Sequence, residues 1–216
     1  MSRRRTIWLS ALLALPVILF VLHHYFIHSP SLKPTGFTNE ENVLYMSYAH
    51  QYLDQDKFSI TYSNPFDGNP QSPHIYFQPA IIVLAGMMKL GIDAGLCFSL
   101  FGLIMTLLCI YIGLKILEHL IPGYKQISLV GTLFTWGGGL TALAGLASAA
   151  FLSGYHTDQW IDGIYFADPA NGWWGLNWGR TLFIPLEAYY HFLFLLNVYL
   201  VLKQKWKAAI MVALLL

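Results

Sequence analysis

The chain has 216 residues, of which 56% are hydrophobic, 16% aromatic and only 11% charged. Soluble domains carry about 25% charged residues, so this composition excludes an ordinary soluble domain and indicates a membrane protein. The formal net charge is +1, and no basic patch with interleaved aromatic residues is present, which argues against nucleic-acid binding. The two cysteines lie in one apolar run and carry no information about the redox compartment.

The first predicted element is an apolar segment over about 6–28, preceded by Arg3, Arg4 and Arg5. It is longer than the apolar core of a cleaved signal peptide, and it contains Pro16. We therefore interpret it as an uncleaved signal anchor with the arginines in the cytoplasm.

The next predicted element is an interfacial helix over about 39–54, within a polar outer region. Thr38 to Glu41 fits a capping box, in which the Thr38 hydroxyl and the Glu41 carboxylate each bond the other residue's backbone amide. A cap accounts for one carboxylate of the pair Glu40–Glu41. A carboxylate at a membrane boundary is costly to take out of water, so a chemical role for this pair is the competing interpretation.

The apolar segment 77–90 has fewer than the roughly 20 residues that a span needs, so we predict a second interfacial helix there. Spans are predicted to follow near 95–118, 127–153 and 182–202, with a partial span over 207–216. Because the chain ends inside that last apolar run, we expect it to be the N-terminal part of a longer protein. The predicted fold is all-α, a single transmembrane domain over 1–216 built as a polytopic helical bundle with juxtamembrane helices in the first extracytoplasmic loop.

The positions of the lysines predict the topology. If 77–90 does not cross, Lys115, Lys125 and the lysines of 203–207 join the arginines on the cytoplasmic side, as the positive-inside rule requires. If it crossed, all five lysines would lie outside. We therefore expect the outer loops 29–94 and 154–181 to share one face of a bacterial inner membrane, with the N-terminus cytoplasmic.

The loop 154–181 carries four tryptophans and a single basic residue, Arg180. Tryptophans suit the lipid–water interface, and their faces also stack on sugar rings. An arginine beside them can hold a phosphate by a bidentate contact. Farther along, Glu187 and His191 are four residues apart and share a helix face, either as a structural pair or as the wall of a site.

The order of these features resembles the N-terminal half of the GT-C fold membrane glycosyltransferases, the class that contains protein O-mannosyltransferases and aminoarabinose transferases. Within that class, the order of features most resembles that of bacterial, mannosyltransferase-like members. The resemblance rests on the signal anchor, the acidic pair heading a juxtamembrane helix, the Asn-Pro turns of 64–70, the Tyr76-Phe77-x-Pro79 sequence before a short apolar helix, and a Gly-rich later span.

This resemblance implies transfer of a sugar from a polyprenyl-phosphate carrier to a hydroxyl of a lipid, glycan or protein on the extracytoplasmic face. In that class an acidic pair activates the acceptor hydroxyl or helps to bind a divalent cation, so Mg or Mn is the only cofactor it implies. Glu40 and Glu41 match that pair and are the candidate catalytic residues. The candidate substrate-binding residues are Arg180, Trp173, Trp174, Trp178, Tyr76, His74, Asp158, Glu187 and His191; no metal ligand is assigned.

The alternative is a non-enzymatic polytopic membrane protein, such as a transporter, flippase or assembly factor. Its acids would then be helix caps and its tryptophans interface anchors. Transporters often contain inverted repeats, and no internal repeat is found in this sequence. Either interpretation makes membrane lipid a partner.

Overall fold

The structure is a computed structural model, and it describes residues 2–26, 41–53, 60–64, 67, 69, 71–137 and 178–216. Within these ranges the protein is helical and contains no strand, which confirms the predicted all-α class. Two extended segments meet at one antiparallel bridge, between Tyr62 and Tyr76.

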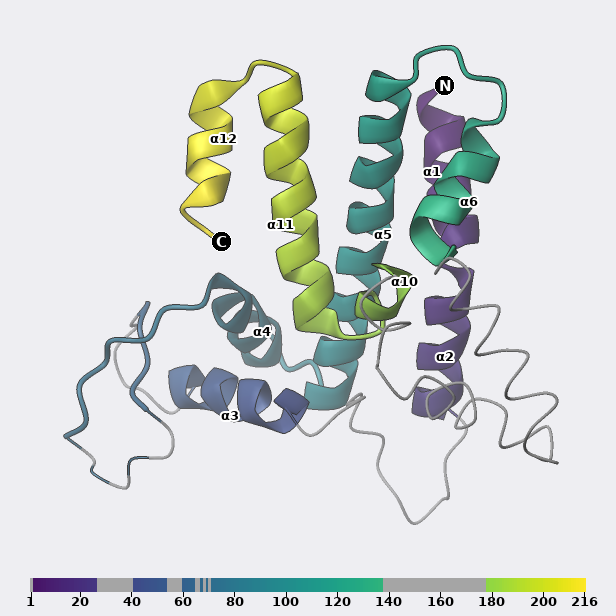
Figure 1. Cartoon of the computed structure of the whole chain (residues 1–216). Helices are drawn as coiled ribbons and strands as arrows, with labels where there is room; N and C mark the ends of the chain where they lie inside the picture. The colour runs from purple at the N-terminus through teal and green to yellow at the C-terminus, as the bar shows by residue number, and fades with distance from the viewer. Residues whose placement is uncertain are drawn as a thin grey trace, which may run out of the picture.

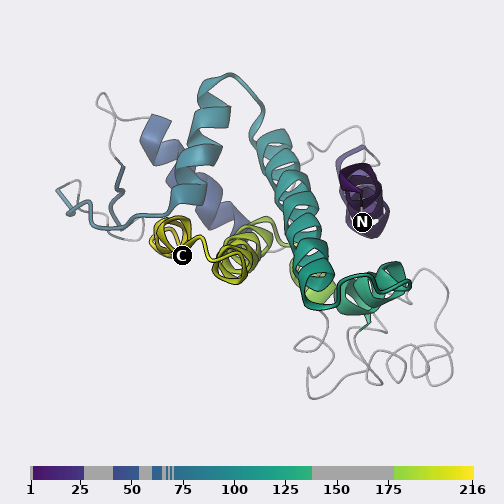
Figure 2. The same ribbon diagram turned by 90° about the horizontal axis from the view of Figure 1, so that it is seen from above.

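The centre of the bundle is α5 (Ala94–Leu120), a helix of 27 residues. The Asp93 carboxylate caps its start by accepting hydrogen bonds from the amides of Gly95 and Leu96, at 3.0 and 3.2 Å. On one side α5 packs against α11 (Pro185–Leu202), and on the other against the N-terminal helices and α6 (Ile127–Trp136) (Figure 1, Figure 2).

The contact between α5 and α11 depends on a small residue. A Cβ at Gly102 of α5 would lie 2.8 Å from Cγ of Pro185, the first residue of α11. A glycine therefore lets the two backbones approach closely, as is common between membrane helices. The buried Thr106 hydroxyl adds a hydrogen bond of 2.9 Å to the Leu182 carbonyl, just before α11 begins.

The N-terminal apolar segment is broken into α1 (Arg3–Leu13) and α2 (Leu15–Phe26), which are bent by 48°. Pro16 explains the break, because it has no amide hydrogen for the preceding turn and its ring crowds that turn. The Trp136 indole donates a hydrogen bond of 2.9 Å to the Leu13 carbonyl at the bend. The sequence predicts one span over 6–28, and the structure places a bend within it.

Two helices, α5 and α11, are long and apolar enough to cross a membrane, and the bent pair of α1 and α2 adds a third if it forms one span. The described part of the predicted span 127–153 is α6, and its residues from 138 onward lie outside the described residues. The last helix, α12 (Trp206–Ala213), turns back along α11, and the Asn197 amide donates to the Ala209 carbonyl at 2.8 Å.

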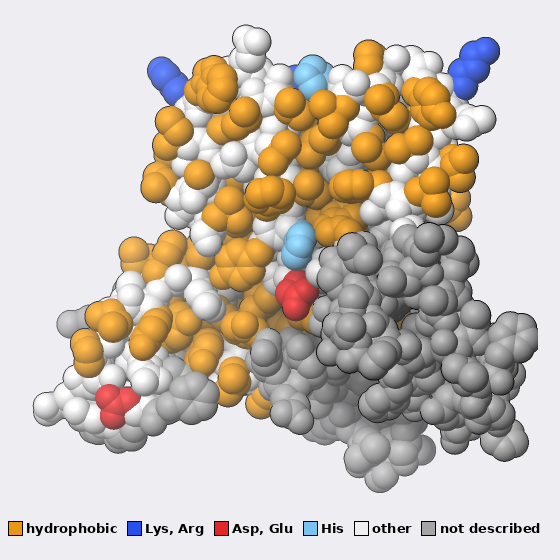
Figure 3. Space-filling view, in the orientation of Figure 1, with side chains coloured by type: hydrophobic (Ala, Val, Ile, Leu, Met, Phe, Trp, Pro, Cys, Tyr) orange, Lys and Arg blue, Asp and Glu red, His pale blue; other side chains and the backbone are white. Residues whose placement is uncertain are grey.

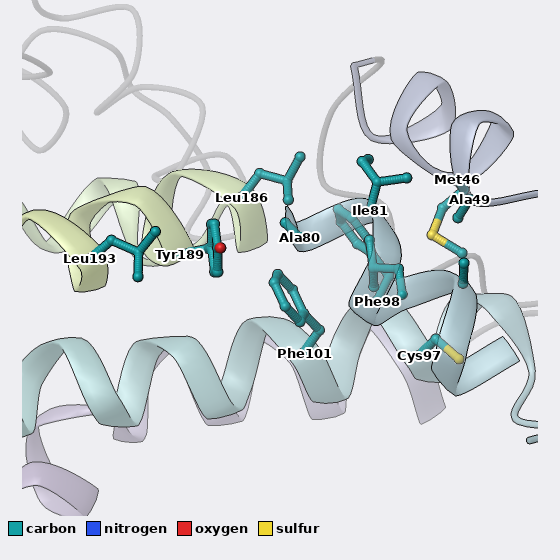
Figure 4. Close-up of a cluster of buried hydrophobic side chains, with 12 residues drawn as sticks. Met46, Ala49, Ala80, Ile81, Cys97, Phe98, Phe101, Leu186, Tyr189 and Leu193 are labelled. Atoms are coloured by element: carbon teal, nitrogen blue, oxygen red, sulfur yellow. The ribbon is translucent and has the colours of Figure 1, made fainter. Parts of the chain in front are cut away.

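Two shorter helices, α3 (Glu41–Leu53) and α4 (Pro79–Lys89), lie across the bundle and not along it (Figure 1). They pack on each other and, through α4, on the first turns of α5. A buried apolar cluster joins this layer to α11 (Figure 4), and its members include Met46, Ala49, Ala80, Ile81, Phe98, Phe101, Leu186 and Tyr189. This cluster fixes the crosswise layer against the start of α5 and the start of α11.

The two ends of the bundle differ in charge. We name as the basic end the one where α1 and α12 begin and α5 and α11 end (Figure 1). Most of the described lysines and arginines lie there, and the blue side chains visible in Figure 3 gather at its two upper corners. The crosswise layer, the start of α5 and the start of α11 lie at the other end, which we name the layer end.

Candidate functional site

Of the predicted acidic pair, the structure describes only the backbone of Glu41, the first residue of α3, at the layer end. The described part of α3 starts at Glu41, and the predicted start at residue 39 lies outside the described residues. Thr38, Asn39 and Glu40 lie outside the described residues, as does the side chain of Glu41. The capping box and the catalytic assignment of the pair therefore stay predictions.

A row of three tyrosine rings lies along α3, formed by Tyr48, Tyr62 and Tyr76, and we name it the tyrosine stack. Ring centroids lie 4.8 Å apart for Tyr48 and Tyr62 and 5.6 Å apart for Tyr62 and Tyr76, with both pairs close to parallel. Tyr62 is only 3% exposed, whereas Tyr76 is 43% exposed. The candidate substrate-binding residue Tyr76 is thus the accessible end of a rigid aromatic row.

Backbone and side-chain hydrogen bonds hold this row in place. Tyr62 and Tyr76 exchange both backbone hydrogen bonds, at 2.9 and 3.1 Å. The Tyr52 hydroxyl donates to the Ile60 carbonyl at 3.0 Å, which ties the segment to α3. The exposed His74 ring donates through Nδ1 to the Thr61 carbonyl at 3.3 Å, so His74 serves here to join the two paired segments.

Burial changes the ionisation of the stack. It raises the pKa of Tyr62 to about 12 from its usual 10.0, and the neighbouring tyrosines add to this shift. Burial also raises the pKa of Tyr48 and of Tyr52. The hydroxyl groups of Tyr48, Tyr52 and Tyr62 therefore stay neutral at physiological pH and act as hydrogen-bonding groups.

This shift predicts how stability depends on pH. The unfolded chain loses the Tyr62 proton near pH 10, whereas the folded protein keeps it to about pH 12, so stability is lost as the pH rises through that range. We expect Tyr62→Phe in detergent to show a smaller fall in unfolding temperature over the same range. Tyr124→Phe, at an exposed position of the basic end, is the matched control. Identical declines for Tyr62→Phe and the unaltered protein would contradict the assignment.

Two further candidates, Glu187 and His191, lie in the first turns of α11, at the layer end. Glu187 occupies the first turn, where the helix dipole favours a negative charge. His191 donates through Nδ1 to the Glu187 backbone carbonyl at 2.8 Å, so the pair is joined through the backbone. In the neutral imidazole, Nε2 then carries the lone pair and can accept a proton or a hydrogen bond.

The end of the loop 154–181 contributes two candidates in the described residues. Trp178 begins the short helix α10 (Trp178–Thr181), and its ring lies 5.0 Å from that of Phe134 in α6. Trp178 is partly buried and packs against the apolar cluster between the N-terminal helices and α5. Arg180 lies in the same helix, and its side chain falls outside the described residues. Trp173, Trp174 and Asp158 also lie outside the described residues.

Among the described residues, no three His, Cys, Asp or Glu side chains lie close enough together to hold a metal ion. The acids that the resemblance would assign to a divalent cation, Glu40 and Glu41, have no described side chains.

The tyrosine stack was only partly foreseeable from the sequence. Tyr45, Tyr48 and Tyr52 recur at helical spacing, which predicts that they share a face of one helix. Tyr62 stands in a turn-rich segment with no periodic pattern, so nothing in the sequence predicts that its ring is inserted between Tyr48 and Tyr76.

Comparison of the chain with models of protein families, with curated proteins and with solved structures finds no match.

Proposed function

We propose that this protein is a membrane glycosyltransferase of the GT-C type, which moves a sugar from a polyprenyl-phosphate carrier to an acceptor hydroxyl at the layer end. The observation that carries this proposal is the gathering of candidate residues at that end. The start of α3, the tyrosine stack and the start of α11 with Glu187 and His191 lie there together, opposite the basic end.

The proposed reaction is a direct displacement. Glu40 or Glu41 accepts the proton of the acceptor hydroxyl as the acceptor oxygen bonds to the anomeric carbon. The bond between that carbon and the carrier phosphate oxygen breaks, and the phosphate leaves with the electron pair, so the anomeric configuration is inverted. Arg180 would neutralise the leaving phosphate through a bidentate contact.

The remaining candidates would position the substrates. The accessible face of Tyr76 offers an apolar surface on which a sugar ring can stack, held rigid by Tyr62 behind it. Trp173 and Trp174 would line the groove for the sugar or the lipid. The Glu187 carboxylate and the Nε2 atom of His191 can form hydrogen bonds with sugar hydroxyls. Both residues lie in the first turns of α11, at the layer end.

The test is transfer of labelled sugar in membranes that contain the protein. Membranes are supplied with a polyprenyl-phosphate-linked labelled sugar, and product is separated from the donor by extraction. We expect labelled glycan, lipid or protein to form in these membranes and not in membranes without the protein. Movement of the carrier across the bilayer with no transfer of its sugar would favour the flippase alternative.

A further inference from the structure

The basic end contains a cavity that the proposed reaction does not use. Its volume is about 200 Å³, and it lies between the start of α1, the end of α5 and the turn that leads into α6. Its lining includes Arg5, Glu118, Gly123, Tyr124 and Lys125. A water molecule takes about 30 Å³ of liquid volume, so the cavity has room for a tetrahedral anion.

The charges around the cavity favour an anion. The Glu118 carboxylate accepts a hydrogen bond of 2.8 Å from the Lys115 ammonium group, which balances its charge. Arg5 and Lys125 then leave the lining positively charged. An arginine fork matches two oxygens of a phosphate, and a lysine adds a second cation, so the chemistry of the lining fits a phosphate group.

The surroundings of the cavity favour a phosphate attached to a lipid. The candidate span α5 ends at Leu120, directly before the cavity, which places the cavity at the depth of the headgroups. Trp8 stands three residues after Arg5 on α1, hence on the same face, and is 76% exposed. Leu12, seven residues after Arg5, lies on this face as well and is 64% exposed. Apolar surface suited to an acyl chain therefore lies beside a polar cavity suited to its headgroup.

We propose that this cavity binds the phosphate of an anionic membrane lipid, with Arg5 and Lys125 as its main contacts and α1 beside the acyl chains. Basic pockets between membrane helices are a known means of holding anionic headgroups. The proposal depends on membrane insertion and is independent of the proposed sugar transfer.

The experiment measures lipid binding to the whole chain in a nonionic detergent by native mass spectrometry. The protein is titrated with phosphatidylglycerol and, separately, with phosphatidylcholine. We expect the first phosphatidylglycerol to bind more tightly than phosphatidylcholine, and the double variant Arg5→Gln, Lys125→Gln to weaken it about tenfold or more. The control, Lys205→Gln with Lys207→Gln, removes two charges from the same end outside the cavity lining and should leave binding unchanged.

Two further measurements separate a lipid site from a site for free anions. Lys125→Gln alone alters an exposed side chain before α6, so it should fold and still weaken phosphatidylglycerol binding. Inorganic phosphate, added at the lipid concentration, should not displace the lipid. Equal losses in the cavity and control variants would overturn the proposal. So would full displacement by inorganic phosphate, which would make the cavity a site for free anions.

Discussion

Replacing Glu40 and Glu41 together by glutamine is expected to lower the rate of sugar transfer by about 10²–10⁴-fold, the usual contribution of a general base. Glutamine keeps the size and hydrogen-bonding capacity of each side chain and removes only its ability to accept the proton. The measurement is initial-rate transfer of labelled sugar in membranes with matched amounts of each protein. The KM for the donor should change little, because the base acts on the acceptor hydroxyl.

The single variants and a matched control identify the base. The glutamate that acts as base should account for most of the loss, and the other should behave as a helix cap with a small effect on rate. Glu118→Gln makes the same chemical change at the basic end, where the carboxylate pairs with Lys115, and should keep full activity. Unchanged transfer in the double variant would show that neither glutamate is the base.

Replacing Phe101 by alanine is expected to cost about 3–5 kcal/mol of stability, as large-to-small changes at buried aromatic residues do. Phe101 is 1% exposed, and its ring lies 5.8 Å from that of Tyr189 on α11, in the apolar cluster that joins α5 and α11 to the crosswise layer. Its removal leaves a cavity between α5, α11 and α4, where Phe101 lies beside Tyr189 and Ala80 (Figure 4). The measurement is reversible unfolding of the purified protein in mixed detergent micelles.

Phe194→Ala is the matched control for this prediction. Phe194 lies on α11 as well, but it is 57% exposed, so its truncation opens no internal cavity. We expect its effect to be below about 1 kcal/mol, as for other substitutions outside a packed core. Equal losses for the two variants would show that the cluster around Phe101 does not hold the layer to the bundle.

The apolar runs of the sequence predict the helices well, because burial in a membrane requires long runs of apolar residues. The predicted range 95–118 corresponds to α5, and the short range 77–90 corresponds to α4. The bend between α1 and α2 was harder to predict. Pro16 marks the place, but whether a proline bends a helix or stops it depends on neighbours such as Trp136, which bonds the Leu13 carbonyl.

The candidate site could be predicted only where its residues follow a helical period. Glu187 and His191 are four apart on α11, and the structure joins them, through the Glu187 carbonyl and not its carboxylate. The tyrosine stack depends on a bridge between residues 14 apart in turn-rich chain, for which no local pattern exists. The cavity beside Arg5 and Lys125 joins residues far apart in the sequence, so only the fold reveals it.

The proposed site requires the crosswise layer and the loop 154–181 to share one face of the membrane, so the membrane topology of these two segments is its decisive test. Single cysteines at Gln71, Asp158 and Gln126 are labelled with a membrane-impermeant maleimide in intact cells and after permeabilisation. The native Cys97 and Cys109 are buried and should react slowly. We predict that Gln71→Cys and Asp158→Cys label from outside, and Gln126→Cys only after permeabilisation. Labelling of Asp158→Cys from the same side as Gln126→Cys would separate the two halves of the site and contradict the account.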